Sequence, residues 1–160
     1  MEKEYTFVMI RPGALRRKKV IYIMNLIKSE GLKIEYFKEK QLTDDFIYDH
    51  YKNLICDEIP FDVFERTKTE NLSGEVIGMI VSGVNAVAIM RSLIGPSNVK
   101  KAKEEFPNSI RALGNPDNNP DNLIHASDSV LSAEEEINRY FGIDIKEFKK
   151  MDSFQLSKTK

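Results

Sequence analysis

The strongest constraint on the fold comes from residues 76–81, an uninterrupted apolar run with the sequence VIGMIV. Gly74 and Gly83 bound this run on its two sides. A strand that lacks polar alternation has to be covered on both faces, as in the centre of a sheet. The run therefore predicts a central strand with helices packed on either side of the sheet.

The rest of the chain supplies strands and helices in an ordered series. Residue types predict a strand at 5–10 that ends at Arg11-Pro12-Gly13, a half-exposed or edge strand at 32–42 and a short last strand at 123–126. Apolar spacing and capping residues predict helices at 19–30, 43–54, 60–70 and 85–93, and one from a capping box at Ser132 to Phe141. The order contains βαββαβ, the split arrangement of ferredoxin-like folds. We therefore expect an α+β sandwich in which helices cover a four-stranded antiparallel sheet.

Length and composition exclude several classes of protein. The 160 residues suit one domain at 1–142, followed by a polar C-terminal extension at 143–160 that we expect to be partly disordered. The 24 Lys and Arg residues nearly balance 25 Asp and Glu residues, which argues against a protein that coats nucleic acid. One cysteine and two histidines can build neither an intrachain disulfide nor a Cys/His zinc centre. The apolar stretch at 7–10 is too short for a signal peptide or a membrane span, so we expect a cytoplasmic protein.

One short segment of the sequence can carry chemistry. The common signatures G-x-x-x-x-G-K-[ST], G-x-G-x-x-G, H-E-x-x-H and G-x-S-x-G are absent. What remains is residues 122–129, NLIHASDS, where His125 leaves a strand just before a helix that carries Glu136. A neutral imidazole nitrogen can attack phosphorus when its other nitrogen donates a hydrogen bond to a carboxylate. The local pattern alone fits a packed histidine without chemical function at least as well.

The same segment resembles a known family. Asn122-x-x-His125-Ala126-Ser127-Asp128-Ser129 is close to the N-x-x-H-G-S-D-S signature of nucleoside diphosphate kinases. Further positions match in the family's order, namely Arg11-Pro12, His50-Tyr51, Pro60-Phe61, Asn85, Arg91, Gly95-Pro96-Ser97, Ile110-Arg111 and Ser132-Ala133-x-x-Glu136-Ile137. The resemblance extends from Lys3 to about Phe141 and so covers most of the chain.

This resemblance implies an enzyme that moves the γ-phosphoryl group of a nucleoside triphosphate to a nucleoside diphosphate by a ping-pong mechanism. The carrier would be a phosphohistidine on His125, with Glu136 as the orienting carboxylate and Ser127 and Tyr51 as further catalytic residues. Mg²⁺ would arrive bound to the nucleotide phosphates, without a metal ligand from the protein. The resemblance also implies a homo-oligomer, either a tetramer or a hexamer.

The resemblance further implies a set of nucleotide contacts. These are Arg11, Arg91, Arg111, Ser97 and Tyr51 to phosphates, Asn122 to the sugar hydroxyl and Phe61 to the base. An arginine fork chelates phosphate oxygens and neutralises the charge that spreads over a transferring phosphoryl group. An aromatic face stacks on any base without reading its edge, which fits the broad nucleotide use of the family.

The sequence departs from the family pattern at the end of the first strand. Where the family has K-P-D, this chain has Arg11-Pro12-Gly13. Arginine is larger than lysine and directs its donors differently, so the exchange is not conservative at a phosphate site. Ala126 also stands where the family usually has glycine. A nucleotide-binding homologue with impaired catalysis is therefore the alternative.

A third hypothesis, a ferredoxin-like RNA-binding module, ranks last. Nothing in the sequence resembles the K/R-G-F/Y-G/A-F-V motif of such modules. The basic run Arg16-Arg17-Lys18-Lys19 is interpreted as solvated helix surface, and His50 as a surface histidine on its helix. We therefore expect nucleoside di- and triphosphates as ligands, without nucleic acid and without a membrane.

Overall fold

The computed structural model describes residues 2–55, 60–116 and 122–158. Its elements are, in order, β1 (Lys3–Ile10), α1 (Pro12–Arg16), α2 (Val20–Ser29), β2 (Lys33–Gln41), α3 (Asp44–Ile55), α4 (Phe61–Leu72), β3 (Glu75–Val84), α5 (Ala86–Ile94), α6 (Val99–Glu105), the 3₁₀ helix η1 (Ile110–Leu113), β4 (Ile124–Ala126), α7 (Val130–Phe141) and α8 (Ile145–Lys158). Each strand and helix expected from the sequence has a counterpart, displaced by a few residues at most. Helices α1, α6 and α8 and the 3₁₀ helix η1 have no counterpart among the expected elements.

The four strands form one antiparallel sheet in the order β2-β3-β1-β4. Strand β3 lies inside the sheet, with Ile80 opposite Phe7 of β1 and Met79 opposite Phe37 of β2. Residues 76–82 are all buried, as the apolar run predicts. The element order and the sheet order together are those of a ferredoxin-like fold, so the expected α+β sandwich is confirmed.

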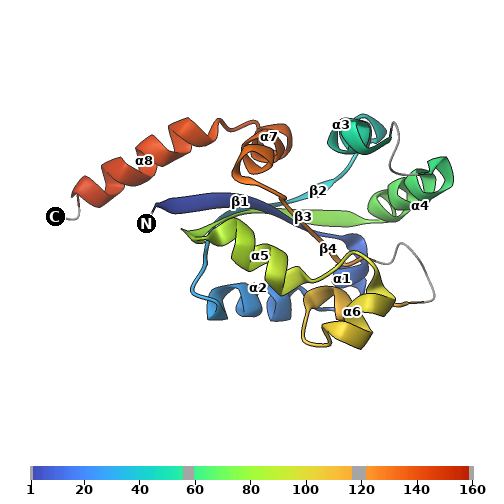
Figure 1. Ribbon diagram of the computed structural model, residues 1–160. Helices are drawn as coiled ribbons and strands as arrows, with labels where there is room; N and C mark the ends of the chain where they lie inside the picture. Colours follow the sequence, from blue (N-terminus) through green and yellow to red (C-terminus); the bar gives the residue numbers. More distant parts are fainter. Residues whose placement is uncertain (1, 56–59, 117–121, 159–160) are drawn as a thin grey trace.

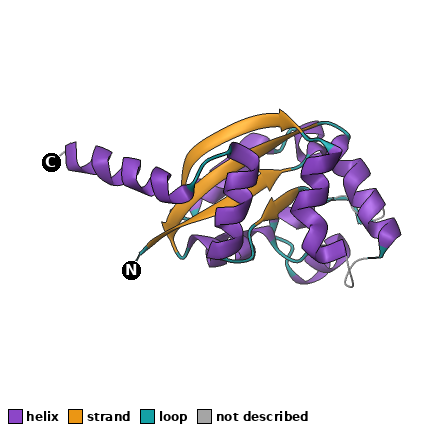
Figure 2. Ribbon diagram, turned by 90° about the horizontal axis from the view of Figure 1, so that it is seen from above, coloured by secondary structure: helices purple, strands orange, loops and turns teal. Residues whose placement is uncertain are grey.

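Helices cover both faces of the sheet, with α2 and α5 below it and α3 and α7 above it in the view of Figure 1 (see also Figure 2). Side chains alternate along β1, so Val8 and Ile10 enter the lower core and Phe7 and Met9 the upper one. Helices α3 and α7 contact each other above the sheet, and this contact positions the candidate site. Among the described helices, none is long and apolar enough to cross a membrane.

Helix α7 begins earlier than the expected capping box. Its N-cap is Ser129, whose extended backbone suits that position and whose hydroxyl accepts a 3.1 Å hydrogen bond from the backbone N–H of Ser132. Ser132 therefore lies in the first turn, and the prediction that it caps the helix is wrong. Because the helix starts at Val130, the chain turns from β4 into α7 within a few residues of His125.

Residues 145–158 form helix α8, where the polar composition predicts partial disorder. Ile145 is 3% exposed and packs in the upper core. Phe148 packs edge-on against the ring of Tyr5, with centroids 5.8 Å apart and planes at 82°. These two apolar contacts attach the start of α8 to the domain, although most of its neighbours in the sequence are polar. The division into a domain at 1–142 and an extension stays a prediction.

Candidate active site

His125 lies in the middle of β4, opposite Met9 of β1. Its side chain is 17% exposed, so the ring is accessible to solvent. Nε2 lies 2.6 Å from Oε1 of Glu136, a residue of α7. An ionised carboxylate can only accept, so Nε2 carries the proton and Nδ1 keeps a lone pair. The ring therefore has one fixed nitrogen and one that can act as a nucleophile.

Glu136 is held through both of its carboxylate oxygens. His125 donates to Oε1, and the hydroxyl of Ser127 donates to Oε2. Ser127 is itself tied to Phe7 across the sheet, because its N–H donates to the Phe7 carbonyl at 3.0 Å and its Oγ accepts from the Phe7 N–H at 3.2 Å. The structure thus brings together three residues that the sequence predicts, namely His125, Glu136 and Ser127.

His50 of α3 joins this cluster, so its interpretation as a surface histidine is wrong. Its side chain is 2% exposed, and its ring meets the His125 ring edge-on, with centroids 4.7 Å apart and planes at 79°. Nε2 lies 3.9 Å from Oε1 of Glu136, and Nδ1 lies 3.2 Å from Nη1 of Arg139. Burial first, and then the charges of His125, Arg139 and Arg11, hold the pKa of His50 well below its usual value of 6.5. His50 is therefore a neutral imidazole at neutral pH.

Arg111 of η1 supplies a buried positive charge. Its guanidinium donates to Oδ1 of Asn122 at 3.0 Å and to the carbonyls of Gly95 at 2.8 Å and Ile124 at 3.3 Å. Burial, followed by the charges of Arg11 and Arg91, lowers the pKa of Arg111 to about 10, so it stays charged at neutral pH. The amide oxygen of Asn122, which the resemblance assigns to a sugar hydroxyl, is here an acceptor for Arg111.

Two further arginines interact with this charge. Arg11 is 5% exposed and donates from Nη2 to the hydroxyl of Tyr51 at 2.7 Å. Its buried Nε has no hydrogen-bond partner among the described residues, which leaves a donor open for an acceptor. Arg91 forms a 2.9 Å ion pair with Asp128, and both side chains are exposed. Arg11, Arg91 and Arg111 together give the region a positive charge that suits a phosphate chain.

The remaining two predicted nucleotide contacts lie on the surface. Phe61 opens α4 and is 74% exposed. Ser97 is exposed and directly precedes Asn98, the N-cap of α6, whose side chain accepts from the N–H of Lys101 at 3.0 Å. In the described part of the chain, the hydrogen bonds and ring contacts that join the His125 cluster include neither Phe61 nor Ser97.

Within residues 2–55, 60–116 and 122–158, one group has the spacing of metal ligands. His50, His125 and Glu136 each offer one atom, and these atoms lie within 4.8 Å of one another. Mg²⁺ takes oxygen ligands in octahedral geometry, whereas this group offers two nitrogens and an oxygen that already accepts from His125. The protein's own residues at this site therefore do not fit a resident Mg²⁺.

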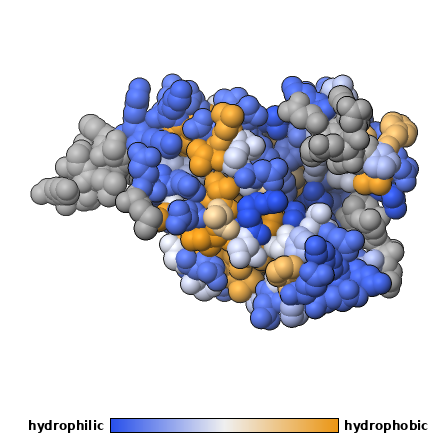
Figure 3. Space-filling model, in the orientation of Figure 1, coloured by the Kyte–Doolittle hydropathy of each residue, from blue (hydrophilic) through white to orange (hydrophobic). Residues whose placement is uncertain are grey.

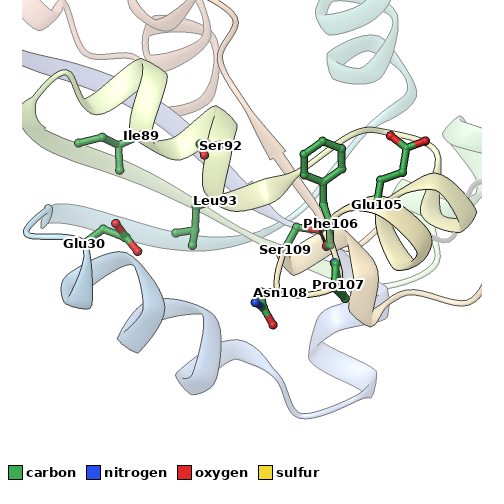
Figure 4. Close-up of a pocket in the computed structure, with 9 residues that line it drawn as sticks. All are labelled: Glu30, Ile89, Ser92, Leu93, Glu105, Phe106, Pro107, Asn108 and Ser109. Carbon is green, nitrogen blue, oxygen red and sulfur yellow. Dashed lines mark hydrogen bonds between the residues drawn. The ribbon is translucent and has the colours of Figure 1, made fainter.

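A cavity of about 480 Å³ lies apart from these residues (Figure 4). Its walls come from the end of α2, from α5 and from the segment around the end of α6, with Glu30, Ile89, Leu93, Phe106 and Ser109 among the lining residues. None of the site residues expected from the sequence lines it. The His125 cluster thus lies outside this cavity.

Comparisons with known proteins agree with these features. The family model of nucleoside diphosphate kinase matches residues 4–145. A nucleoside diphosphate kinase of Methanocaldococcus jannaschii is 36% identical over 145 residues, covering 89% of this chain and 96% of that protein. The crystal structure of the Aquifex aeolicus nucleoside diphosphate kinase has a TM-score of 0.78 at 31% identity, covering 88% of this chain and 96% of that one. The Halobacterium salinarum enzyme in complex with CDP has a TM-score of 0.77 at 29% identity, covering 89% and 90%.

Proposed function

The chain belongs to the nucleoside diphosphate kinase family, and from this premise we propose that Nδ1 of His125 carries the phosphoryl group between nucleotides. As a member of this family, it is a phosphotransferase that binds nucleotides. One observation carries the proposal: the 2.6 Å hydrogen bond from Nε2 of His125 to Glu136 leaves the lone pair on Nδ1.

In the first half-reaction, Nδ1 of His125 attacks the γ-phosphorus of a nucleoside triphosphate. The N–P bond forms, the bond from the γ-phosphorus to the β,γ-bridging oxygen breaks, and the electron pair leaves on the diphosphate. The ring then carries positive charge, which Glu136 stabilises through Nε2–H. After the first diphosphate leaves, a second nucleoside diphosphate takes the phosphoryl group by the reverse steps.

The arginines neutralise the charge that moves during these steps. Phosphoryl transfer is catalysed mainly by positioning and by charge stabilisation, because negative charge spreads over the oxygens of the transferring group. Arg111 is held rigidly by three acceptors, and Arg11 keeps an open Nε donor. Arg91 can exchange its exposed partner Asp128 for a phosphate. In the same proposal Ser97 and Tyr51 contact phosphates.

The base and the sugar have simpler roles in the proposal. Phe61 stacks its exposed ring on the base, and stacking without edge recognition permits many nucleotides. Asn122 binds the sugar hydroxyl while its oxygen still accepts from Arg111. The family works with a divalent metal ion, and we propose that this ion is Mg²⁺, brought in on the nucleotide phosphates, since the His50, His125 and Glu136 group does not fit it.

We also propose that the protein is a homo-oligomer, either a tetramer or a hexamer. An apolar band crosses one face of the molecule over α5 and α7 (Figure 3). The edge strand β2 exposes the rings of Tyr36 and Phe37 by 46% and 59%. Exposed apolar surface and an open sheet edge are typical of contacts between chains. For its location we propose the cytoplasm, where nucleoside triphosphates are made and used.

A second candidate function rests on Arg11, which stands where the family has lysine. Its Nη2 and the hydroxyl of Tyr51, both expected to contact phosphate, are hydrogen-bonded to each other at 2.7 Å. A phosphate would have to compete with this bond, and the fork cannot imitate a lysine point charge. The chain would then bind nucleotides and transfer phosphoryl groups poorly.

The intact mass of the protein after incubation with ATP and Mg²⁺ tests the proposed carrier. We expect an acid-labile phosphoryl adduct that is absent in His125→Ala and that GDP discharges with formation of GTP. His125→Ala should still bind ATP, since the arginines remain. An adduct that persists in His125→Ala would refute His125 as the carrier. ATP binding without an adduct in the wild type would favour the second candidate.

A further inference from the structure

Arg139 and His50 form a hydrogen-bonded pair next to the Glu136 carboxylate, and the proposed mechanism gives neither residue a role. His50 is fixed from several directions, because Phe46 stacks on its ring at 5.9 Å and 13°, and Tyr51 meets it edge-on at 4.7 Å. Arg139 of α7 reaches the same ring with Nη1, 3.2 Å from Nδ1. The contact between α3 and α7 is thus a polar one at this point, beside the reacting histidine.

The hydrogen bond from Arg139 determines which nitrogen of His50 carries the proton. A guanidinium can only donate, so Nδ1 of His50 must accept. Neutral His50 then carries its proton on Nε2, which lies 3.9 Å from Oε1 of Glu136. Protonation of Nδ1 would place two N–H groups and two positive charges against each other, and the contact with Arg139 would be lost.

Building on the proposed function, we propose that Arg139 is a positioning residue for phosphoryl transfer. By donating to Nδ1, it holds His50 in the tautomer that turns Nε2–H toward Glu136, and its charge adds to the burial that keeps the ring neutral. The neutral ring then supports the His125 ring from the side and leaves Glu136 to serve as the charge partner of His125 alone. A protonated His50 would compete for the same carboxylate oxygen and draw it away from Nε2 of the nucleophile.

The charges around His50 come from every element that packs on it. Glu136 and Arg139 face it from α7, His125 from β4 and Arg11 from the end of β1, with Tyr51 beside it on α3. Burial is the largest cause that lowers its pKa, and Arg139 is one of three charges that lower it further. Removal of Arg139 therefore takes away part of the effect, so His50 begins to accept a proton at a higher pH.

Two variants test this hydrogen bond. Arg139→Leu removes the donor and the charge, whereas Arg139→Lys keeps a positively charged group that can only donate. Arg66→Leu is the matched control, since Arg66 is an exposed arginine of α4 that pairs with Asp62. The chain has only two histidines, so long-range ¹H–¹⁵N NMR of the untagged protein reports the tautomers of His50 and His125 directly.

In the wild type, Arg66→Leu and Arg139→Lys, we expect His50 in the Nε2–H tautomer. In Arg139→Leu, we expect mixed tautomers and a change in the pH profile of single-turnover phosphoryl uptake. Relative to the wild type, the rate should stay within about twofold near pH 8 and should fall as the pH drops below 6.5, with a further loss of about twofold at the pH where half of the His50 rings are protonated.

An unchanged His50 tautomer in Arg139→Leu would overturn the proposal. So would an equal loss of rate at all pH values, since a merely structural role predicts that result. If the wild type takes up no phosphoryl group, the proposed function fails on its own. In that case the NMR experiment still decides whether Arg139 determines the tautomer of His50.

Discussion

The ring of Tyr140 occupies the space in which a side chain of Gly78 would lie. A Cβ atom at position 78 would come within 2.3 Å of Cε1 of Tyr140. The Tyr140 hydroxyl accepts from the N–H of Gly78 at 3.0 Å and donates to the carbonyl of Lys38 at 2.6 Å. The glycine inside the central strand thus allows α7 to lie close enough to the sheet to bring Glu136 to His125.

Gly78→Ala should therefore destabilise the protein by about 2–4 kcal/mol, since overpacking of a fully buried contact forces backbone shifts. Urea denaturation of the variant measures this loss. In a Tyr140→Leu background the same substitution should cost less, because the ring is gone. An equal cost in both backgrounds would mean that the tyrosine is not the obstacle.

Lys18 adopts a left-handed backbone conformation, with φ of 57°, between α1 and α2. A residue with a Cβ atom is strained there and glycine is not, so Lys18→Gly should raise the free energy of unfolding by up to about 1 kcal/mol. Lys28→Gly is the matched control within α2, and it should lower the stability by about 1 kcal/mol. Thermal unfolding of both variants tests this, and a loss of stability in Lys18→Gly would contradict it.

Glu136→Gln should slow phosphoryl uptake by roughly 10²–10⁴-fold, because the amide cannot stabilise the positive charge of the His125 ring. Quench-flow with intact-mass detection measures the rate. Glu135→Gln is the matched control, since Glu135 is the exposed neighbour on the same helix. Near wild-type uptake in Glu136→Gln would remove the carboxylate from the mechanism.

His50 also makes the stability depend on pH. Its pKa in the folded protein is lowered well below 6.5, so in acid the unfolded chain binds a proton that the folded chain does not. The contribution of His50 to the free energy of unfolding should thus be constant above pH 6.5. Below pH 6.5 it should fall by at most about 1.4 kcal/mol per pH unit. His50→Gln should show a shallower fall in urea denaturation between about pH 6.5 and pH 5. Parallel curves for the two proteins would disprove the assignment.

Arg11→Lys distinguishes the two candidate functions. If the arginine impairs catalysis, the lysine should raise turnover about tenfold or more, whereas an efficient enzyme should gain little or lose activity. A coupled assay of GTP formation from ATP and GDP measures the turnover. Arg66→Lys, an exchange on the surface of α4, controls for general effects of the substitution.

Much of the fold could be predicted because its signals are local. The apolar run at 76–81 and the half-polar strand at 32–42 identify the inner and edge strands, and the order of elements limits how they can pair. The N-cap of α7 was harder to predict, since Ser129 and Ser132 both precede apolar residues and the choice depends on backbone geometry after β4. Helix α8 depends on Ile145 and Phe148, whose apolar contacts lie far away in the sequence.

In the candidate site, too, contacts between residues close in the sequence could be predicted and contacts between distant elements could not. His125, Glu136 and Ser127 lie within one strand–helix unit, so their spacing alone predicts that they meet. His50 and Arg139 meet because α3 packs on α7, and the two residues are 89 positions apart in the sequence, a contact that no periodicity encodes. The one local sign that His50 belongs to the site is its place on the apolar side of an amphipathic helix, beside Tyr51.

The hydrogen bonds between Ser127 and Phe7 join positions 120 residues apart, and this separation affects the order in which the structure forms during synthesis on the ribosome. Strand β1 is synthesised before β4 and α7, so its edge next to β4 and its upper face stay uncovered until those two elements emerge. Until α7 has left the exit tunnel, His125 of β4 lacks the carboxylate of Glu136. A nascent chain therefore meets nucleotides with an incomplete reaction centre until α7 has been made.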